Sequence, residues 1–179
     1  GSAPPCRPKV LCVGWLKTGT TSFAHAMRHL GYWHYTWDQD IARVWYKQDG
    51  DISRMLRFAK SFESFDDVPW SRLEFVDAFA AAYPDAKYVL LERDMDEWHD
   101  SLVRFRQKRG IVARTSREED IAEHLERIHY LSGKFSGEQM LRMNVFDGDG
   151  YDKLCPFLGL PVPADPFPRV NVNTTVRAR

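Results

Sequence analysis

The stretch Gly14-Trp15-Leu16-Lys17-Thr18-Gly19-Thr20-Thr21-Ser22 decides the fold of this chain. It follows the short apolar run Lys9–Gly14, which is typical of a buried parallel strand. It leads into Thr21–Leu30, where apolar residues recur with helical spacing until Gly31 ends the pattern. A strand, a glycine loop and a helix in this order indicate the opening of a nucleotide-binding α/β fold.

The loop differs from the nucleotide-binding pattern GxxxxGK[ST] at one position. Gly14 and Gly19 have the required separation and Thr21 supplies the final hydroxyl, but Thr20 stands where the lysine belongs. The lysine lies earlier instead, at Lys17. Backbone N–H groups of such a loop and the helix N-terminus after it still form a cradle for an anion. A lysine at this earlier place can stabilise charge on a departing phosphate, and we expect this chemistry to require no metal.

A second pattern follows the apolar strand Lys87–Glu92. Arg93 stands at the end of that strand, and Ser101 comes eight residues later on the next helix. The carboxyl edge of a parallel sheet is where α/β folds bind ligands. A guanidinium grips a phosphate through two hydrogen bonds, and a serine adds one more donor. The pair therefore predicts a second phosphate contact.

Together these motifs resemble those of the sulfotransferases. Lys17-Thr18-Gly19-Thr20-Thr21 is similar to their 5′-phosphosulfate-binding loop, and the similarity extends from about Lys9 to Asn171. Trp15 and Leu16 depart from it, since a proline or small residue is common there. The resemblance implies 3′-phosphoadenosine-5′-phosphosulfate (PAPS) as donor, PAP as product, in-line displacement, and no metal. It also implies a set of donor-binding residues, with Lys17 catalytic as well: Lys17, Thr18, Gly19, Thr20, Thr21, Ser22, Arg93, Ser101 and, from a late basic segment, Arg169.

The residue that takes the acceptor's proton is left open by the sequence. His34 follows the first predicted helix and has a side chain suited to proton transfer. An alternative role for it is that of a half-buried histidine among aromatic residues. Asp66 and Asp67 precede Pro69, and they are either candidates for the base or the N-cap of the next helix. We carry His34 and Asp67 forward as candidate catalytic residues.

The composition fits one soluble domain. The 179 residues include 25 basic and 25 acidic side chains, and this zero net charge argues against a general nucleic-acid binder. The three cysteines are scattered, which favours the reducing cytoplasm. No apolar run is long enough to cross a bilayer. We expect residues 1–8 to be a tag remnant and lead-in, 9–171 to be a single sulfotransferase domain, and 172–179 to be a C-terminal tail.

Alternating strands and helices predict an α/β fold with a three-layer, P-loop-like arrangement around a parallel sheet. The acceptor is open between a small molecule and a glycan, and so is the oligomeric state. A P-loop kinase or a nucleotide-binding module without activity is the alternative function. We expect strands at Lys9–Gly14, Tyr32–Trp37, Phe62–Phe65, Lys87–Glu92 and Met140–Val145. We expect helices at Thr21–Leu30, Gln39–Tyr46, Ile52–Lys60, Trp70–Tyr83, Asp96–Lys108, Arg117–Leu131 and Tyr151–Leu158.

Overall fold

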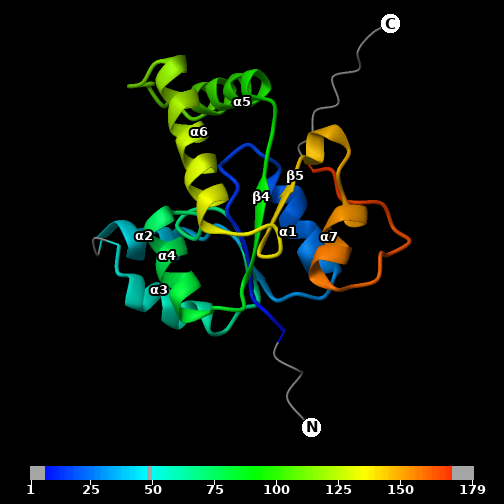
Figure 1. Cartoon of the computed structure of the whole chain (residues 1–179). Coiled ribbons are helices and arrows are strands. Elements are labelled where there is room, and N and C mark those ends of the chain that lie inside the picture. Colours follow the sequence, from blue (N-terminus) through cyan, green and yellow to red (C-terminus); the bar gives the residue numbers. More distant parts are fainter. Residues whose placement is uncertain (1–6, 48–49, 171–179) are drawn as a thin grey trace, which may run out of the picture.

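A computed structural model describes residues 7–47 and 50–170 of the chain (Figure 1). The predicted tail 172–179, Asn171 and residues 1–6 of the predicted lead-in lie outside the described residues. Five parallel strands form one sheet in the order β2-β3-β1-β4-β5. They are β1 (Val10–Cys12), β2 (His34–Tyr35), β3 (Ser64–Phe65), β4 (Lys87–Leu91) and β5 (Met140–Met143).

Helices cover both faces of this sheet and rise above one end of it (Figure 1). The helices are α1 (Thr20–His29), α2 (Gln39–Lys47), α3 (Ile52–Ala59), α4 (Leu73–Ala82), α5 (Met95–Lys108), α6 (Arg117–Lys134), α7 (Tyr151–Leu158) and the 3₁₀ turn η1 (Val145–Asp147). Helices α1 and α7 lie on one side of the sheet, and α2, α3 and α4 lie on the other. The predicted α/β class with a central parallel sheet is therefore confirmed.

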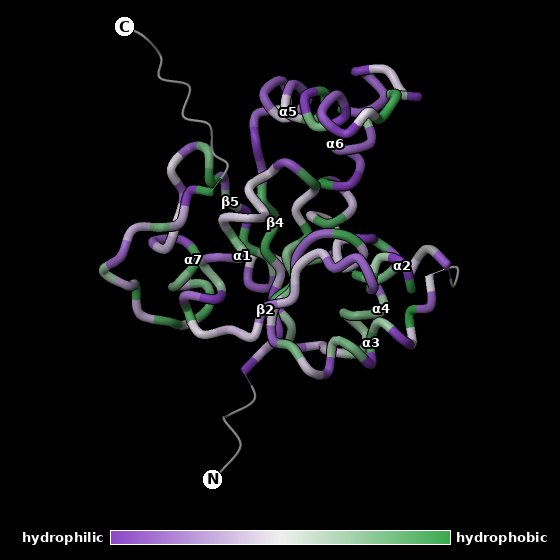
Figure 2. The backbone as a smooth tube through the Cα atoms, turned by 180° about the vertical axis from the view of Figure 1, so that it is seen from behind, coloured by the Kyte–Doolittle hydropathy of each residue, from purple (hydrophilic) through white to green (hydrophobic). Residues whose placement is uncertain are grey.

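The alternation of side chains along the strands explains why the core has two halves. Successive residues of a strand point to opposite faces of the sheet. Leu11 belongs to the apolar cluster under α2, α3, α4 and α6, whereas Val10 and Cys12 belong to the cluster under α1 and α7. Figure 2 shows the hydrophobic strand β4 running through the middle, while α5 and α6 carry many hydrophilic residues.

The elements agree with the predicted order, with differences at their ends. The helix predicted from Trp70 begins at Leu73, because Trp70 is fully buried in the loop before it. The strands predicted at Tyr32–Trp37 and Phe62–Phe65 are only two residues long each. The turn η1 was not predicted; it forms because the Asn144 side chain accepts bonds from the N–H groups of Phe146 and Asp147.

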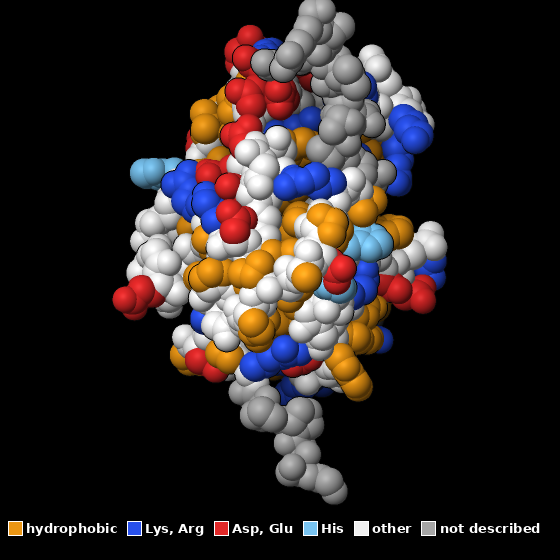
Figure 3. All heavy atoms as spheres, turned by 90° about the vertical axis from the view of Figure 1, so that its right-hand side faces the viewer, with side chains coloured by type: hydrophobic (Ala, Val, Ile, Leu, Met, Phe, Trp, Pro, Cys, Tyr) orange, Lys and Arg blue, Asp and Glu red, His pale blue; other side chains and the backbone are white. Residues whose placement is uncertain are grey.

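One face of the molecule carries side chains of both charges. On the face in Figure 3, acidic side chains gather near the top, beside the grey atoms, and basic and acidic side chains are interspersed below them. Among the described residues, no helix has the length and apolar character needed to cross a membrane.

Candidate functional site

Four loops meet at one edge of the sheet because strands β1, β3, β4 and β5 are parallel. The carboxyl end of each strand therefore points the same way, and the loops after them lie together. These loops are residues 13–19 after β1, 66–72 after β3, 92–94 after β4 and 144–150 around η1. Every predicted site residue except His34, Ser101 and Arg169 lies in these loops or in the first turn of α1.

The glycine loop is held from β4 and α5. The Trp98 indole N–H donates to the carbonyl of Leu16 over 2.9 Å, and Arg93 Nη1 donates to the carbonyl of Lys17 over 3.2 Å. A Cβ on Gly14 would come within 2.8 Å of the Leu91 Cβ, so the loop and β4 approach more closely than any other residue would permit. These braces fix the loop relative to the second predicted phosphate contact.

The first turn of α1 has no side-chain cap. Its N-cap is Gly19, at φ 102°, which offers no side chain to bond the free N–H groups of that turn. Such groups, together with the helix dipole, attract negative charge. The anion cradle predicted from the sequence would therefore be formed by backbone N–H groups.

The predicted hydroxyl donors of this loop divide into two pairs. Thr18 and Ser22 are fully buried and already bonded: Thr18 donates to the carbonyl of Trp15, and Ser22 both accepts from and donates to the backbone of Val170. Thr20 is partly exposed and Thr21 is exposed. In this arrangement Thr18 and Ser22 shape the loop, and Thr20 and Thr21 present their hydroxyls outward.

Lys17 and Asp67 share an unusual backbone conformation. They are the two non-glycine residues with positive φ in the described part of the chain, at 64° and 67°. A non-glycine residue held there stores strain that the surrounding structure must stabilise, and such residues cluster at functional sites. The Lys17 ammonium also lies over the ring of Phe105, 4.6 Å from its centroid.

The surroundings shift the pKa values of Lys17 and Asp67 in opposite directions. Burial, and then the nearby cations Arg109 and Lys108, lower the pKa of Lys17. Burial and the neighbouring Asp66 raise the pKa of Asp67, although the N–H of Val68 donates to its carboxylate over 2.7 Å. Lys17 and Asp67 each stabilise the charged form of the other, which places them in one electrostatic environment.

His34 lies in the core rather than at the open edge. Its side chain has no exposed surface, and its ring stands edge-on to Phe23 with centroids 5.8 Å apart. Nδ1 is 2.7 Å from Ser64 Oγ, and Nε2 is 2.7 Å from Asp66 Oδ1. With both ring nitrogens bonded, His34 holds Asp66 in place next to Asp67, and we do not assign it the acceptor's proton.

Arg93 keeps part of its hydrogen-bonding capacity unused. Its guanidinium stacks 3.8 Å above the ring of Phe146, and its Nε is buried without a partner among the described residues. Burial is the main cause that lowers the pKa of Arg93. Ser101 lies two turns into α5, half-buried. This pair therefore remains a candidate for binding a second phosphate.

Arg169 fastens the end of the described chain to η1. Its guanidinium donates to the carbonyl of Val145 over 2.5 Å and to the carbonyl of Gly148 over 3.2 Å. It therefore lies beside Phe146, and so near Arg93, but both of these hydrogen bonds go to backbone carbonyls. Phe146 was not anticipated from sequence, since an aromatic residue in a turn gives no signal of its own.

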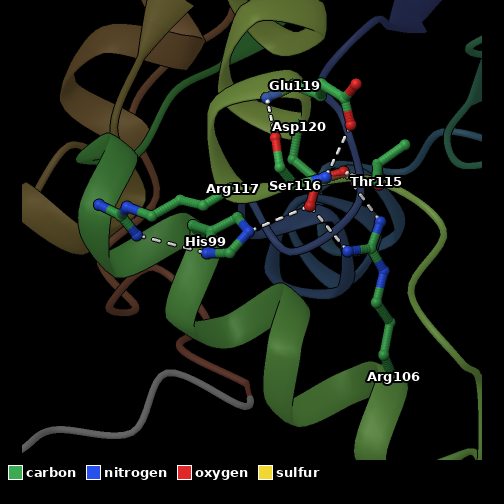
Figure 4. Close-up of polar contacts among 7 residues, drawn as sticks. All are labelled: His99, Arg106, Thr115, Ser116, Arg117, Glu119 and Asp120. Atoms are coloured by element: carbon green, nitrogen blue, oxygen red, sulfur yellow. Dashed lines mark hydrogen bonds and ion pairs between the residues drawn. The ribbon is translucent and has the colours of Figure 1, made fainter.

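A buried carboxylate joins α5 to α6 above the site (Figure 4). Asp120 accepts bonds from Arg106 and Thr115 and lies 3.0 Å from Nε2 of His99. Bonding to Arg106 is the main cause that lowers the pKa of Asp120 to about 2. Ser116 and Glu119 begin α6 with a capping box, which the sequence pattern Ser-x-x-Glu would have revealed. The network fixes α6 over the loop that carries Lys17.

A family model described as "Sulfotransferase domain" matches residues 9–116 and 105–176. The chain belongs to this sulfotransferase family. A solved structure of a sulfotransferase from Alicyclobacillus acidocaldarius has the same fold, with a TM-score of 0.56 and 20% sequence identity, over 90% of this chain and 84% of that one. A search of curated proteins found no match. The predicted family is therefore confirmed, and the edge described above is the place to look for its chemistry.

Proposed function

We propose that this sulfotransferase uses PAPS as donor and transfers its sulfuryl group to a hydroxyl or amine of a small-molecule or glycan acceptor. The observation that carries the proposal is the strained backbone of both Lys17 and Asp67, the residues predicted from sequence to act in catalysis. Two loops far apart in the chain each hold one such residue at the same sheet edge.

The donor would lie along the glycine loop, with its 5′-phosphosulfate at the first turn of α1. Its 3′-phosphate would meet Arg93 and Ser101, where the unpartnered Nε of Arg93 supports an anionic ligand. Arg169 lies close enough, through η1, to add positive potential to that phosphate.

Transfer would proceed by direct displacement at sulfur. The acceptor oxygen or nitrogen forms a bond to sulfur while the bond from sulfur to the bridging phosphate oxygen breaks. The electron pair of that bond leaves with the phosphate, where Lys17 and the α1 N-terminus stabilise the developing charge. The acceptor's proton passes to the Asp67 carboxylate, whose raised pKa suits a general base better than that of an ordinary aspartate.

Asp66, which is hydrogen-bonded to His34, lies next to Asp67 in the chain and affects its pKa. The carboxylate of Asp66, held by His34, is one of the causes that raise the pKa of Asp67. The proposed transfer uses no metal ion, because Lys17 and the N-terminus of α1 stabilise the charge on the leaving phosphate. For the location we propose the cytoplasm, where the buried thiols of Cys12 and Cys155 would stay free.

The test is a comparison of nucleotide binding without metal. Isothermal titration with PAP, AMP and ATP, each with and without magnesium, separates the functions. We expect PAP to bind without magnesium and much more tightly than AMP, which lacks only the 3′-phosphate. Tight binding of ATP with magnesium and none of PAP would overturn the proposal in favour of a kinase.

A further inference from the structure

A cavity of about 370 Å³ lies next to both candidate catalytic loops. Trp15, two residues before Lys17, forms one wall, and Arg72, five residues after Asp67, forms another. Helices α4 and α6 complete it. The full lining is Trp15, Arg72, Leu73, Glu74, Glu123, His124, Glu126, Arg127 and Tyr130. Its size suits a small ligand of one ring.

Three residues that line this cavity, Arg72, His124 and Arg127, carry buried polar atoms without a partner. The described part of the chain has eight buried side-chain nitrogen or oxygen atoms without a hydrogen-bond partner, and four of them belong to its lining. They are Nε of Arg72, Nε of Arg127 and both ring nitrogens of His124. The His124 side chain is buried to all but 2% and that of Arg127 to all but 6%. A buried polar group without a partner is costly, so a protein keeps several in one place where a ligand satisfies them.

The two arginines that line the cavity, Arg72 and Arg127, favour a negatively charged ligand. Within residues 7–47 and 50–170, the hydrogen bonds of Arg127 go to the backbone carbonyls of Val13 and Ser71. Among the described residues, neither Arg127 nor Arg72 forms an ion pair with a carboxylate. Burial lowers the pKa of Arg127 to about 10, although the carboxylates of Glu74 and Glu123 partly offset this by stabilising its charge.

His124 adds neutral hydrogen bonding beside these two cations. Burial lowers its pKa to about 4, so it is uncharged at neutral pH and offers one N–H donor and one acceptor nitrogen. Its ring packs edge-on against Trp98, with centroids 4.2 Å apart, which fixes its orientation. A carboxylate and an adjacent hydroxyl or water would satisfy this set of groups.

The mouth of the cavity has the opposite sign. Glu74, Glu123 and Glu126 are all exposed lining residues. They would repel a ligand with several negative charges, while a single acid group on a small ring would pass them and reach the floor. Trp15 and Leu73 offer apolar surface for that ring.

We propose that this cavity binds the acceptor, and that it selects a small hydroxy acid with one carboxylate, held by Arg72, Arg127 and His124. This inference rests on the proposed function, because it supplies the acceptor for the groups at Lys17 and Asp67. It narrows the acceptor from any hydroxyl compound to a monoanionic, single-ring one.

The test uses 4-hydroxybenzoate and its neutral analogue 4-hydroxybenzamide as probes. Each is titrated into the full chain by calorimetry, with and without saturating PAP. We expect the acid to bind about tenfold or more tightly than the amide, since a charge-assisted hydrogen bond to a guanidinium is the stronger kind. The Arg72→Met variant should lose this preference. Arg72 offers no side-chain cap to α4, so its removal leaves that helix intact.

Arg28→Met is the matched control, because it removes one positive charge from an exposed position of α1. It should keep the preference for the acid. Equal binding of acid and amide to the wild-type chain, or an unchanged preference in Arg72→Met, would overturn the inference. PAP titrations of the same proteins report the donor site separately. Normal PAP binding without an acid preference refutes this inference alone, and an acid preference without PAP binding refutes the PAPS donor instead.

Discussion

Replacing Arg93 with methionine tests whether the protein recognises a 3′-phosphate. In the free protein Arg93 Nη1 donates to the carbonyl of Lys17, and the guanidinium stacks on Phe146. Its Nε is buried without a partner and is the group expected to bond the phosphate. Hydrogen bonds to a charged group contribute roughly 1.5–3 kcal/mol each. Two such bonds, less the cost of desolvation, correspond to about 3 kcal/mol, or about a hundredfold in affinity for PAP.

AMP provides the internal comparison, because it lacks only the 3′-phosphate. For AMP the variant loses only the support that Arg93 gives to the Lys17 carbonyl, which we set at about 1 kcal/mol. The loss of that support is common to PAP and AMP, so the preference for PAP over AMP should fall by about 3 kcal/mol, or about a hundredfold. Isothermal titration of both nucleotides measures this ratio, with Arg28→Met as the control that should leave it unchanged. An Arg93→Met variant that retains the wild-type ratio would show that Arg93 does not bind the 3′-phosphate.

Three further predictions concern catalysis and stability. Lys17→Met should bind PAP within about tenfold of wild type but lower kcat by about a hundredfold or more, measured by initial rates of sulfuryl transfer; an unchanged kcat would remove Lys17 from the mechanism. Because burial raises the pKa of Asp67, the wild-type kcat/KM should fall with acid at a higher pH than an ordinary aspartate would give, and Asp67→Asn should lose that acid limb with most of its rate. A pH profile of the same shape in both proteins would contradict this role. Asp120, with its pKa lowered to about 2, stabilises the fold above about pH 4 and loses that contribution as the pH falls toward 2. At pH 7, Asp120→Asn should lower the free energy of unfolding by roughly 1–3 kcal/mol and so melt at a lower temperature. Near pH 2 its stability should approach that of the wild type, and thermal melts at both pH values measure this.

The sequence was sufficient for the fold where local pattern and tertiary structure agree. The apolar runs of β1 and β4 and the glycine loop after β1 have signals that act over a few residues, so their positions follow from the sequence alone. Strands β2 and β3 are only two residues long, because they are held by pairing with neighbours rather than by their own propensity. Their lengths were therefore overestimated.

The site was less accessible to sequence reasoning, for reasons of packing. His34 has the chemistry of a base, but only the sheet reveals that Ser64 and Asp66 occupy both its nitrogens. Arg127 stands among charged residues of α6 and has the pattern of a solvated position. Its burial depends on the loops of β1 and β3, which come from distant parts of the chain. Only the assembled structure brings such residues to one cavity.

The bonds between Ser22 and Val170 have a consequence for how the protein matures. The donor loop is encoded near the start of the chain, yet a hydroxyl in the first turn of α1 is held by backbone near its end. During synthesis the ribosome must therefore deliver the chain as far as Val170 before these bonds can form. A nascent chain that has completed β1, β3 and β4 has three neighbouring strands of the sheet, while Ser22 still lacks its partner. A chain released before Val170 would lack both bonds and would leave the first turn of α1 without this brace.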